Sequence, residues 1–134
     1  MTEAEVSNFV VAFAAAWAAR EPSAFEALWH PDGVLHYPYV DRPVAGAEIG
    51  RRNAAHNEQT PDLVWQLLDW TWRGDVVIVE WQLTNMAGGK RVQWRGVDKF
   101  TLRDGKIMEE IVYSDTAPQR ALMEGRHLEP MLRF

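Results

Sequence analysis

The stretch from Trp94 to Asp115, "WRGVDKFTLRDGKIMEEIVYSD", predicts two antiparallel strands joined by a tight turn. The turn carries the pair Asp104-Gly105, which is typical of short hairpin connections. Before the turn, apolar and polar side chains alternate, as in a strand with one buried and one wet face. The apolar face comprises Trp94, Gly96, Asp98, Phe100 and Leu102. Asp98 is therefore a carboxylate on an apolar face, and loss of hydration there is expected to raise its pKa.

The chain before this hairpin predicts further strands of an antiparallel meander. Strands are expected at Leu63–Trp72, Val76–Thr84, Arg91–Leu102 and Lys106–Ser114, with turns at 73–75 and 85–90. In the second strand, Glu80 alternates with the apolar residues and belongs to the opposite, outer face. The outer face also carries Arg91, Gln93, Arg95 and Lys99, and charges there can pair across strands. This outer face is either solvated or the contact surface of a homodimer.

Helices are expected before the meander and at its end. Thr2 to Glu5 has the form of a capping box, and apolar residues at helical spacing continue to Arg20. A second S-x-x-E box, Ser23 to Glu26, predicts a short helix that includes Leu28 and Trp29 and ends at the turn 31–33. A polar third helix is expected over 47–58. Thr116 is expected to cap a last helix that ends at Glu124, with Gly125 as its stop.

The segment "VLHYPYV" (34–40) is extended but interrupted by Pro38. Proline removes a backbone donor, so this segment is an edge strand or the end of a strand. The tail from 126 to 134, "RHLEPMLRF", shows no clear pattern.

Composition limits the class of protein. The chain has 134 residues, which indicates one domain over residues 1–134. A net charge of -5 argues against a nucleic-acid partner, and the absence of cysteine excludes disulfides and Cys-based zinc sites. The start "MTEAEV" is acidic, unlike a signal peptide, and the longest apolar run, Phe9–Ala19, is too short to span a bilayer. We expect a cytoplasmic protein without membrane contact, and no motif calls for a metal or cofactor.

Three motifs carry a resemblance to a known family: "WHPDGVLHYP" (29–38), "PVAGAEIG" (43–50) and the hairpin from Arg95 to Asp115. With them the chain resembles the nuclear transport factor 2-like superfamily, and within it the SnoaL-like polyketide cyclases and the ketosteroid isomerases. The resemblance implies an α+β fold in which three N-terminal helices pack in a strongly bent, mostly antiparallel sheet. This cone, a cystatin-like α+β barrel, leaves an apolar cavity open at one end. Members are isomerases, cyclases, epoxide hydrolases and non-catalytic binders, many of them dimers.

The resemblance also assigns positions. Asp98 matches an Asp in the cavity of ketosteroid isomerases, where an apolar site keeps a carboxylic acid neutral so that it can donate a hydrogen bond. The general-base carboxylate of those enzymes falls at Tyr37, and their tyrosine donor falls near Phe13. The positions that resemble the epoxide-hydrolase set are Val79, Trp81 and Val112, and the turn 85–89 lacks the His of the cyclases. Among these catalytic patterns only Asp98 is retained.

The candidate residues therefore each have two interpretations. The proposed catalytic residues are Asp98, Tyr37 and His56, and the proposed pocket residues are Phe13, Trp17, Asn53, Trp81, Trp94, Phe100, Glu110 and Val112. Asp98 is either a pocket acid or a structural residue paired with Asn53, Arg52 or a backbone donor. The face with Asn53 and His56 either lines the cavity or, in the preferred interpretation, belongs to a solvated lid.

Tyr37, Glu110 and the Trp residues are open to two interpretations in the same way. Tyr37 is a pocket donor or, as slightly preferred, a core residue at the rim, and His36 is expected to face away. The resemblance places Met108, Glu110, Val112 and Ser114 toward the cavity. Glu110 is then a second inward base, or a mouth residue paired with a surface Arg, which is preferred. The Trp residues either line the cavity or fill it.

These observations predict a protein with a pocket for a small apolar molecule. The first hypothesis is a cofactor-independent isomerase- or cyclase-like enzyme that acts by acid–base chemistry on a carbonyl-containing substrate. The alternative is a non-catalytic ligand-binding or dimerisation module of the same fold. A homodimer through the outer sheet face is expected in either case.

Overall fold

A computed structural model describes residues 1–131; the end of the tail, 132–134, lies outside the described residues, and 126–131 form no helix or strand. The strands are β1 (Trp29–His36), β2 (Val44–Ala45), β3 (Val64–Arg73), β4 (Val76–Ala87), β5 (Lys90–Arg103) and β6 (Lys106–Ser114). The helices are α1 (Glu3–Ala19), α2 (Pro22–Glu26), the 3-10 turn η1 (Gly46–Glu48), α3 (Ile49–Gln59) and α4 (Ala117–Met123).

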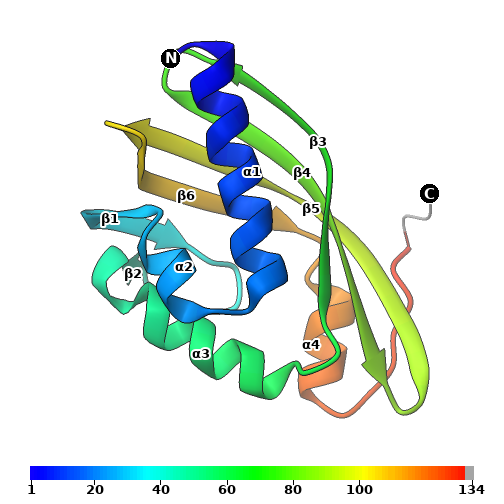
Figure 1. Cartoon of the computed structure of the whole chain (residues 1–134). Helices are drawn as coiled ribbons and strands as arrows, with labels where there is room; N and C mark the ends of the chain where they lie inside the picture. The colour runs from blue at the N-terminus through cyan, green and yellow to red at the C-terminus, as the bar shows by residue number, and fades with distance from the viewer. Residues whose placement is uncertain (132–134) are drawn as a thin grey trace.

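The strands form one curved sheet in the order β2-β1-β6-β5-β4-β3. Strands β3 to β6 pair antiparallel, which confirms the predicted meander, and β1 joins β6 in parallel. Helix α1 lies along the concave face, with α2 and α3 near one end of it (Figure 1). The sheet does not close, since β2 and β3 are its two edges. The α+β class with a strongly bent sheet is therefore confirmed.

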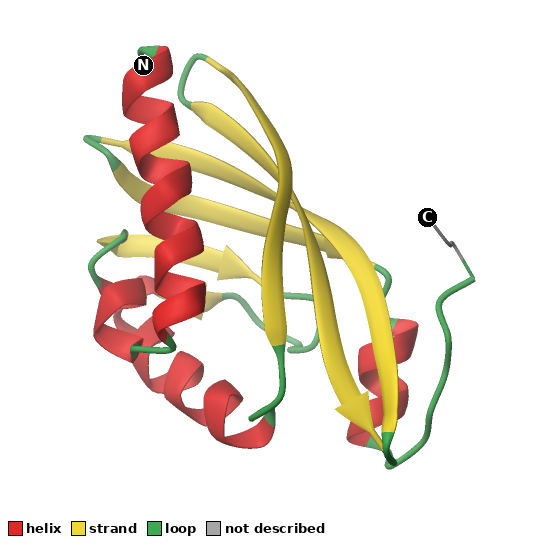
Figure 2. Cartoon of the chain, turned by 45° about the vertical axis from the view of Figure 1, so that its right-hand side comes forward, coloured by secondary structure: helices red, strands yellow, loops and turns green. Residues whose placement is uncertain are grey.

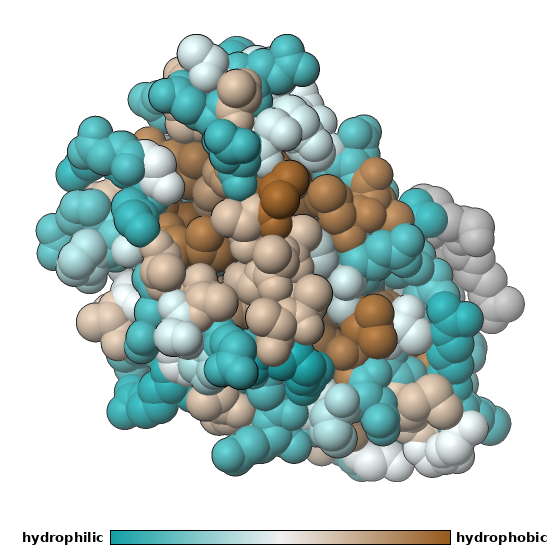
Figure 3. Space-filling view, viewed as in Figure 1, coloured by the Kyte–Doolittle hydropathy of each residue, from teal (hydrophilic) through white to brown (hydrophobic). Residues whose placement is uncertain are grey.

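Helix α1 begins as its sequence predicts. The backbone N–H of Glu5 donates to Thr2 Oγ1 at 3.3 Å, and the N–H of Thr2 donates to the Glu5 carboxylate at 2.7 Å. The buried face of α1 includes Phe9 and Phe13, whose rings lie 5.1 and 4.9 Å from the ring of Phe100 on the sheet. Apolar side chains gather in the middle of this view of the surface, with hydrophilic ones around them (Figure 3).

The second helix differs from the prediction. It begins with Pro22 in its first turn, has no side-chain cap, and ends at Glu26, so the Ser23 capping box is wrong. Trp29 opens β1, and the stretch 31–33 lies within that strand instead of ending a helix. The register against β6 shifts between Trp29 and Val34, and this irregularity accommodates Pro31. A Cβ on Gly33 would lie 2.6 Å from the carbonyl oxygen of Ile107, so glycine is required where the two strands pass.

Helix α3 is preceded by η1 and is held at its far end by Arg20. The Arg20 guanidinium donates to the carbonyl oxygens of Asn57 and Thr60, both at 2.9 Å, and of Leu63 at 3.0 Å. These bonds join the end of α1 to the end of α3 and the approach to β3. Because α3 forms one side of the cavity described below, Arg20 fixes the position of that side.

Pro38 follows the end of β1 at His36, which confirms the strand-end interpretation. Strand β2 pairs with the other side of β1, so β1 is not an edge strand.

Helix α4 runs to Met123 near the far end of the sheet (Figure 2). Gly125 follows it with a φ of 69°, a conformation that glycine adopts readily. Thr116 precedes α4 but makes no side-chain cap. No helix within residues 1–131 is long and apolar enough to cross a membrane.

Candidate functional site

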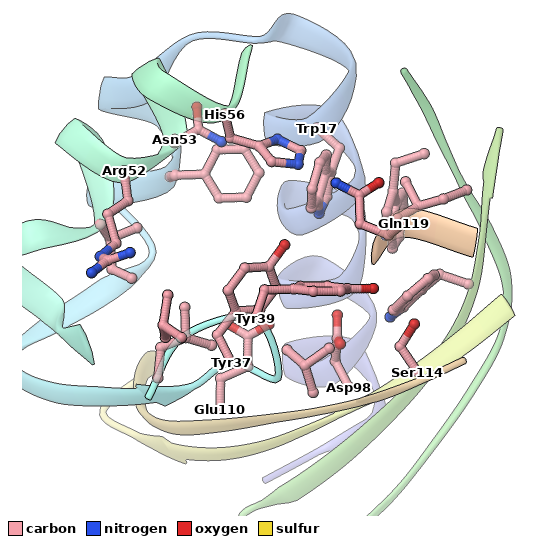
Figure 4. A pocket seen from close by; sticks show the side chains of 18 of the residues that line it. Trp17, Tyr37, Tyr39, Arg52, Asn53, His56, Asp98, Glu110, Ser114 and Gln119 are labelled. Atoms are coloured by element: carbon pink, nitrogen blue, oxygen red, sulfur yellow. The ribbon is translucent and has the colours of Figure 1, made fainter. Parts of the chain in front are cut away.

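A cavity of about 300 Å³ lies between α3, the end of α1 and the concave face of the sheet (Figure 4). Its apolar lining includes Phe13, Trp17, Phe25, Trp29, Leu35, Ile49, Trp65, Trp81, Leu83, Trp94 and Val112. Its polar lining includes Tyr37, Tyr39, Arg52, Asn53, His56, Gln59, Asp98, Glu110, Ser114 and Gln119. Elements far apart in the sequence thus meet around one space that combines aromatic surface with a few polar groups, as ligand pockets do.

Asp98 lies on the sheet side of this cavity and is 3% exposed. Strand β5 places it between Val79 of β4 and Val112 of β6, so both cross-strand neighbours are apolar. The predicted pairing with Asn53 or Arg52 is not observed within residues 1–131, and Asp98 Oδ1 has no hydrogen-bond partner. Burial raises the pKa of Asp98 to about 7, and the nearby indole N–H of Trp81 opposes that rise. Their geometry falls short of a hydrogen bond, since Trp81 Nε1 also lacks a partner.

Glu110 is a second buried carboxyl group, and the preferred prediction of a mouth position is wrong. It is 7% exposed and forms no ion pair with an arginine among residues 1–131. The register between β5 and β6 shifts after Thr101, so Ile107 enters the core instead of Met108, whereas Glu110 still faces inward. Burial raises the pKa of Glu110 well above its usual range, and the charge of Asp98 raises it further.

Asp98 and Glu110, called the acid pair below, lie diagonally on one face of neighbouring strands. Asp98 is opposite Val112, two residues after Glu110. Diagonal neighbours in a sheet lie roughly 7–8 Å apart at Cα, within reach of each other's charge. Two carboxylates in an apolar site resist full ionisation, so the pair retains a proton over a wide pH range.

Two tyrosines border the acid pair. Their rings, Tyr37 and Tyr39, lie 5.0 Å apart edge to face. Burial raises the pKa of Tyr37, and the charges of Tyr39, Asp98 and Glu110 add to that effect, so the phenol stays neutral and can donate. Tyr37 thus borders the cavity, as both the pocket-donor interpretation and the preferred position at the rim allow. His36 faces away as predicted, with Nε2 3.4 Å from Glu109.

Helix α3 faces the acid pair across the cavity. Arg52, Asn53, His56 and Gln59 follow helical spacing and all contribute to the lining, so the preferred prediction of a solvated lid is wrong for this face. The His56 ring lies 6.0 Å from the ring of Trp17. Burial lowers the pKa of His56, and the charge of Arg20 lowers it further, so His56 is neutral at pH 7.

The aromatic candidates border an open space instead of filling it. Trp17, Trp81 and Trp94 line the cavity, and Trp65 stacks on Trp17 with ring centroids 5.9 Å apart. The indole nitrogens of these four residues have no partner within residues 1–131. Phe13 and Val112 also line the cavity, but Phe100 does not. Phe100 is fully buried beneath Phe9 and Phe13, because α1 covers that part of the strand.

Sequence reasoning missed several lining residues. Tyr39 lies in an irregular loop, where no periodicity indicates its direction. Gln119 comes from α4, and its buried Oε1 has no partner. Ser114 lines the cavity as the resemblance implies, whereas Arg52, expected only as a partner of Asp98, lines it on the same helix as Asn53 and His56. Among residues 1–131, no three side chains of the metal-binding types gather at one point.

The comparisons identify a family. The SnoaL-like domain matches residues 10–110. A solved structure of TerC, co-crystallised with polyporic acid, aligns with a TM-score of 0.77 at 20% identity, over 90% of this chain and 98% of TerC. IdmH, a candidate polyketide cyclase from Streptomyces antibioticus, aligns with a TM-score of 0.73 at 18% identity, over 88% of this chain and 97% of that one.

AclR, a candidate hydroxylase from Streptomyces galilaeus, aligns with a TM-score of 0.73 at 23% identity, over 88% of this chain and 94% of AclR. No curated protein sequence gives a significant match. At these identities the solved structures support the fold alone.

Proposed function

This chain belongs to the SnoaL-like domain family, and we propose that its cavity is the active site of a cofactor-independent acid–base enzyme. The substrate is a small, largely apolar molecule with an enolisable carbonyl group. The observation that carries the proposal is the acid pair: two buried carboxyl groups face one aromatic cavity, and both pKa values are raised. Groups whose pKa lies near the working pH are the most effective general acids and bases.

In the proposed reaction, the protonated carboxyl group of the acid pair donates to the carbonyl oxygen of the substrate. The ionised carboxyl group of the pair accepts the proton from the carbon next to that carbonyl, and the electron pair of the broken C–H bond forms the enol. Where the enol is conjugated with a further double bond, return of the proton to the far carbon gives isomerisation. Attack of the enol carbon on a second carbonyl, whose oxygen takes the abstracted proton, gives ring closure. In both routes the enol hydroxyl returns its proton to the carboxylate that donated it. Each route returns both carboxyl groups to their starting state, so no oxidant or reductant is consumed.

Neighbouring residues support this chemistry. Neutral Tyr37 can donate a second hydrogen bond to the developing oxyanion, since the charges around it disfavour its ionisation. Neutral His56 and the amide of Asn53 lie on the α3 side and can orient the substrate. Asn53 Oδ1 accepts from Asn57 Nδ2 at 3.1 Å, and this bond leaves the Asn53 NH₂ group available as a donor.

The proposal is tested by proton exchange on a simple ketone. We expect the protein to accelerate exchange of the acidic carbon-bound protons of 2-tetralone in D₂O, followed by NMR. Asp98→Asn and Glu110→Gln should each slow this exchange at least about 100-fold, the usual contribution of a general acid or base. Asp104→Asn, in the exposed β5–β6 turn, is the matched control. Wild-type exchange no faster than buffer would contradict an acid–base role on such ketones.

A second function is a non-catalytic ligand-binding module. The residue set favours it: by the resemblance, Tyr37 falls at the general-base position of the ketosteroid isomerases, and Val79, Trp81 and Val112 fall at the epoxide-hydrolase positions. In that case Trp fluorescence should report saturable binding of 2-tetralone or polyporic acid, the compound crystallised with TerC, without any proton exchange.

We also propose that two copies pair through the outer face of the sheet. On that face, Ile78, Lys99 and Ile111 form one cross-strand row, and Glu80, Val97 and Tyr113 form the next. Tyr113 is 57% exposed, and β-branched residues beside it offer apolar surface. Light scattering should give a dimer mass that Val97→Glu converts to a monomer mass. A monomeric wild type at micromolar concentration would contradict this pairing.

A further inference from the structure

We infer that Arg52 forms an anion subsite on the α3 side of the cavity, which binds an ionised carboxylate of the substrate. This inference rests on the proposed function, because it names the class of carbonyl compound that the cavity accepts: an apolar oxo acid. Three features support it: the surroundings of Arg52, the charges of the other lining residues, and the position of α3 across the cavity from the acid pair.

Arg52 has no partner in the described part of the chain. It lines the cavity, and its buried Nε makes no hydrogen bond. Its neighbour Arg51 is 78% exposed and lies 3.0 Å from the Glu48 carboxylate, which also pairs with Arg42. Arg20 donates to three backbone carbonyls. Burying a guanidinium nitrogen without an acceptor costs free energy, so we expect a ligand to provide an acceptor on the cavity side of Arg52.

The other lining residues do not supply a counter-charge that pairs with Arg52. The carboxyl groups in the lining, Asp98 and Glu110, belong to the sheet side, and burial favours their neutral forms. Tyr37 and Tyr39 have raised pKa values, and His56 has a lowered one, so all three are neutral at pH 7. Arg52 is therefore the cation of the described lining at pH 7, and a ligand anion would neutralise it.

The arrangement also orients the ligand. Figure 4 shows Arg52 on the α3 side and Asp98 on the sheet side, with Tyr37 and Tyr39 between them in this view. An oxo acid whose carboxylate binds Arg52 presents its other end to the acid pair, which holds a proton for a carbonyl oxygen. The reverse orientation would place a carboxylate beside the acid pair, where like charges repel. Guanidinium also binds carboxylate through two parallel hydrogen bonds, which fixes the direction of the ligand.

The test compares an acid with its neutral isostere, 2-naphthoate and 2-naphthamide, by calorimetry at pH 7. Wild type should bind naphthoate about tenfold to a hundredfold more tightly than naphthamide, as expected for hydrogen bonds to a charged group. Arg52→Met should remove this preference while naphthamide affinity stays within about threefold. Arg52→Lys should retain part of it, and Arg51→Met, a change at the exposed neighbour, should retain all of it.

The outcomes separate the two proposals. Equal binding of naphthoate and naphthamide by wild type would overturn the anion subsite and leave the proposed pocket in place. A preference for naphthoate that survives in Arg52→Met would also overturn it, since another group would then bind the anion. Absence of binding by both probes to the folded protein would contradict the pocket itself, and with it the anion subsite. Circular dichroism of each variant confirms that the comparison concerns folded protein.

Discussion

Asp98 and Glu110 lie on the same inward face of β5 and β6, and neither forms an ion pair within residues 1–131. Sheets ordinarily place carboxylates on the wet face, where water stabilises the charge. Here the alternation of β5 turns Asp98 inward, and the alternation of β6 from Val112 back to Glu110, which lies opposite Phe100, turns Glu110 to the same side. The pair therefore combines two features: an apolar setting that holds protons and an open space in which a substrate could receive them.

The first prediction concerns stability against pH. The pKa of Asp98 is about 7 in the fold and near 3.8 in the unfolded chain, and that of Glu110 is also raised. Between these values the unfolded chain binds fewer protons than the fold. The free energy of unfolding should therefore fall as the pH rises from about 4 to about 7, at up to about 1.4 kcal/mol per pH unit for each group.

Urea unfolding at pH 5 and pH 8 measures this fall. Asp98→Asn should lose less stability than wild type between the two pH values, because an amide does not ionise. Asp104→Asn, at the exposed turn, should behave as wild type. An unchanged pH dependence in Asp98→Asn would mean that Asp98 ionises normally in the fold.

The second prediction separates core from cavity. Phe100 is fully buried under Phe9 and Phe13, whereas Trp94 lines the cavity. Phe100→Ala should lower the free energy of unfolding by about 3–5 kcal/mol, the usual cost of a large core truncation. The milder Phe100→Leu should remain folded and bind 2-tetralone as wild type does. Weakened binding by Phe100→Leu, with Trp94→Leu unaffected, would reverse this assignment.

The third prediction concerns Arg20, which holds the end of α3 through three carbonyl oxygens. Arg20→Met should cost about 1–3 kcal/mol of stability, since buried acceptors lose a charged donor. Amide exchange should speed up at 56–63 more than in β5. Arg42→Met, which removes an exposed ion pair with Glu48, is the control and should change stability less than Arg20→Met does. Uniform acceleration across the protein would show that Arg20 acts on global stability alone.

The fourth prediction compares two glycines. A Cβ at Gly33 would lie 2.6 Å from the backbone oxygen of Ile107, which is fixed in the sheet. A Cβ at Gly50 would meet the side chain of Glu26 at 2.1 Å, and that side chain can move away. Gly33→Ala should therefore cost about 1–3 kcal/mol, as overpacking does, and Gly50→Ala less. Thermal unfolding measures both, and a larger loss in Gly50→Ala would contradict the account of β1.

Local patterns explain which parts of the fold were predictable. The Asp104-Gly105 turn and the alternation around Asp98 are properties of adjacent residues, so the hairpin and its buried face could be predicted. The burial of Glu110 depends on pairing across strands and on the covering loops, which alternation alone does not determine. Trp29 likewise fits helical spacing, but pairing with β6 places it in a strand. Tertiary pairing thus overrides the local pattern at Trp29 and adds burial to it at Glu110.

The candidate site likewise contains residues that local patterns predict and residues that only the assembled fold brings together. Asp98, His56 and the Trp residues were predicted because each lies on a periodic element. Tyr39 and Gln119 come from a loop and from the last helix, and only the assembled fold brings them to the cavity. Their contribution depends on contacts between distant segments.

The central claim is that the acid pair holds a proton at neutral pH inside the cavity. Carbon-13 NMR titration of the side-chain carboxyl carbons measures it directly, with Asp98→Asn and Glu110→Gln used to assign the two signals. The account predicts that the Asp98 signal titrates near pH 7 and that the Glu110 signal titrates well above 4.5. If both signals titrate at or below pH 4.5, the pair is fully ionised at neutral pH, and the proposed acid–base mechanism is contradicted.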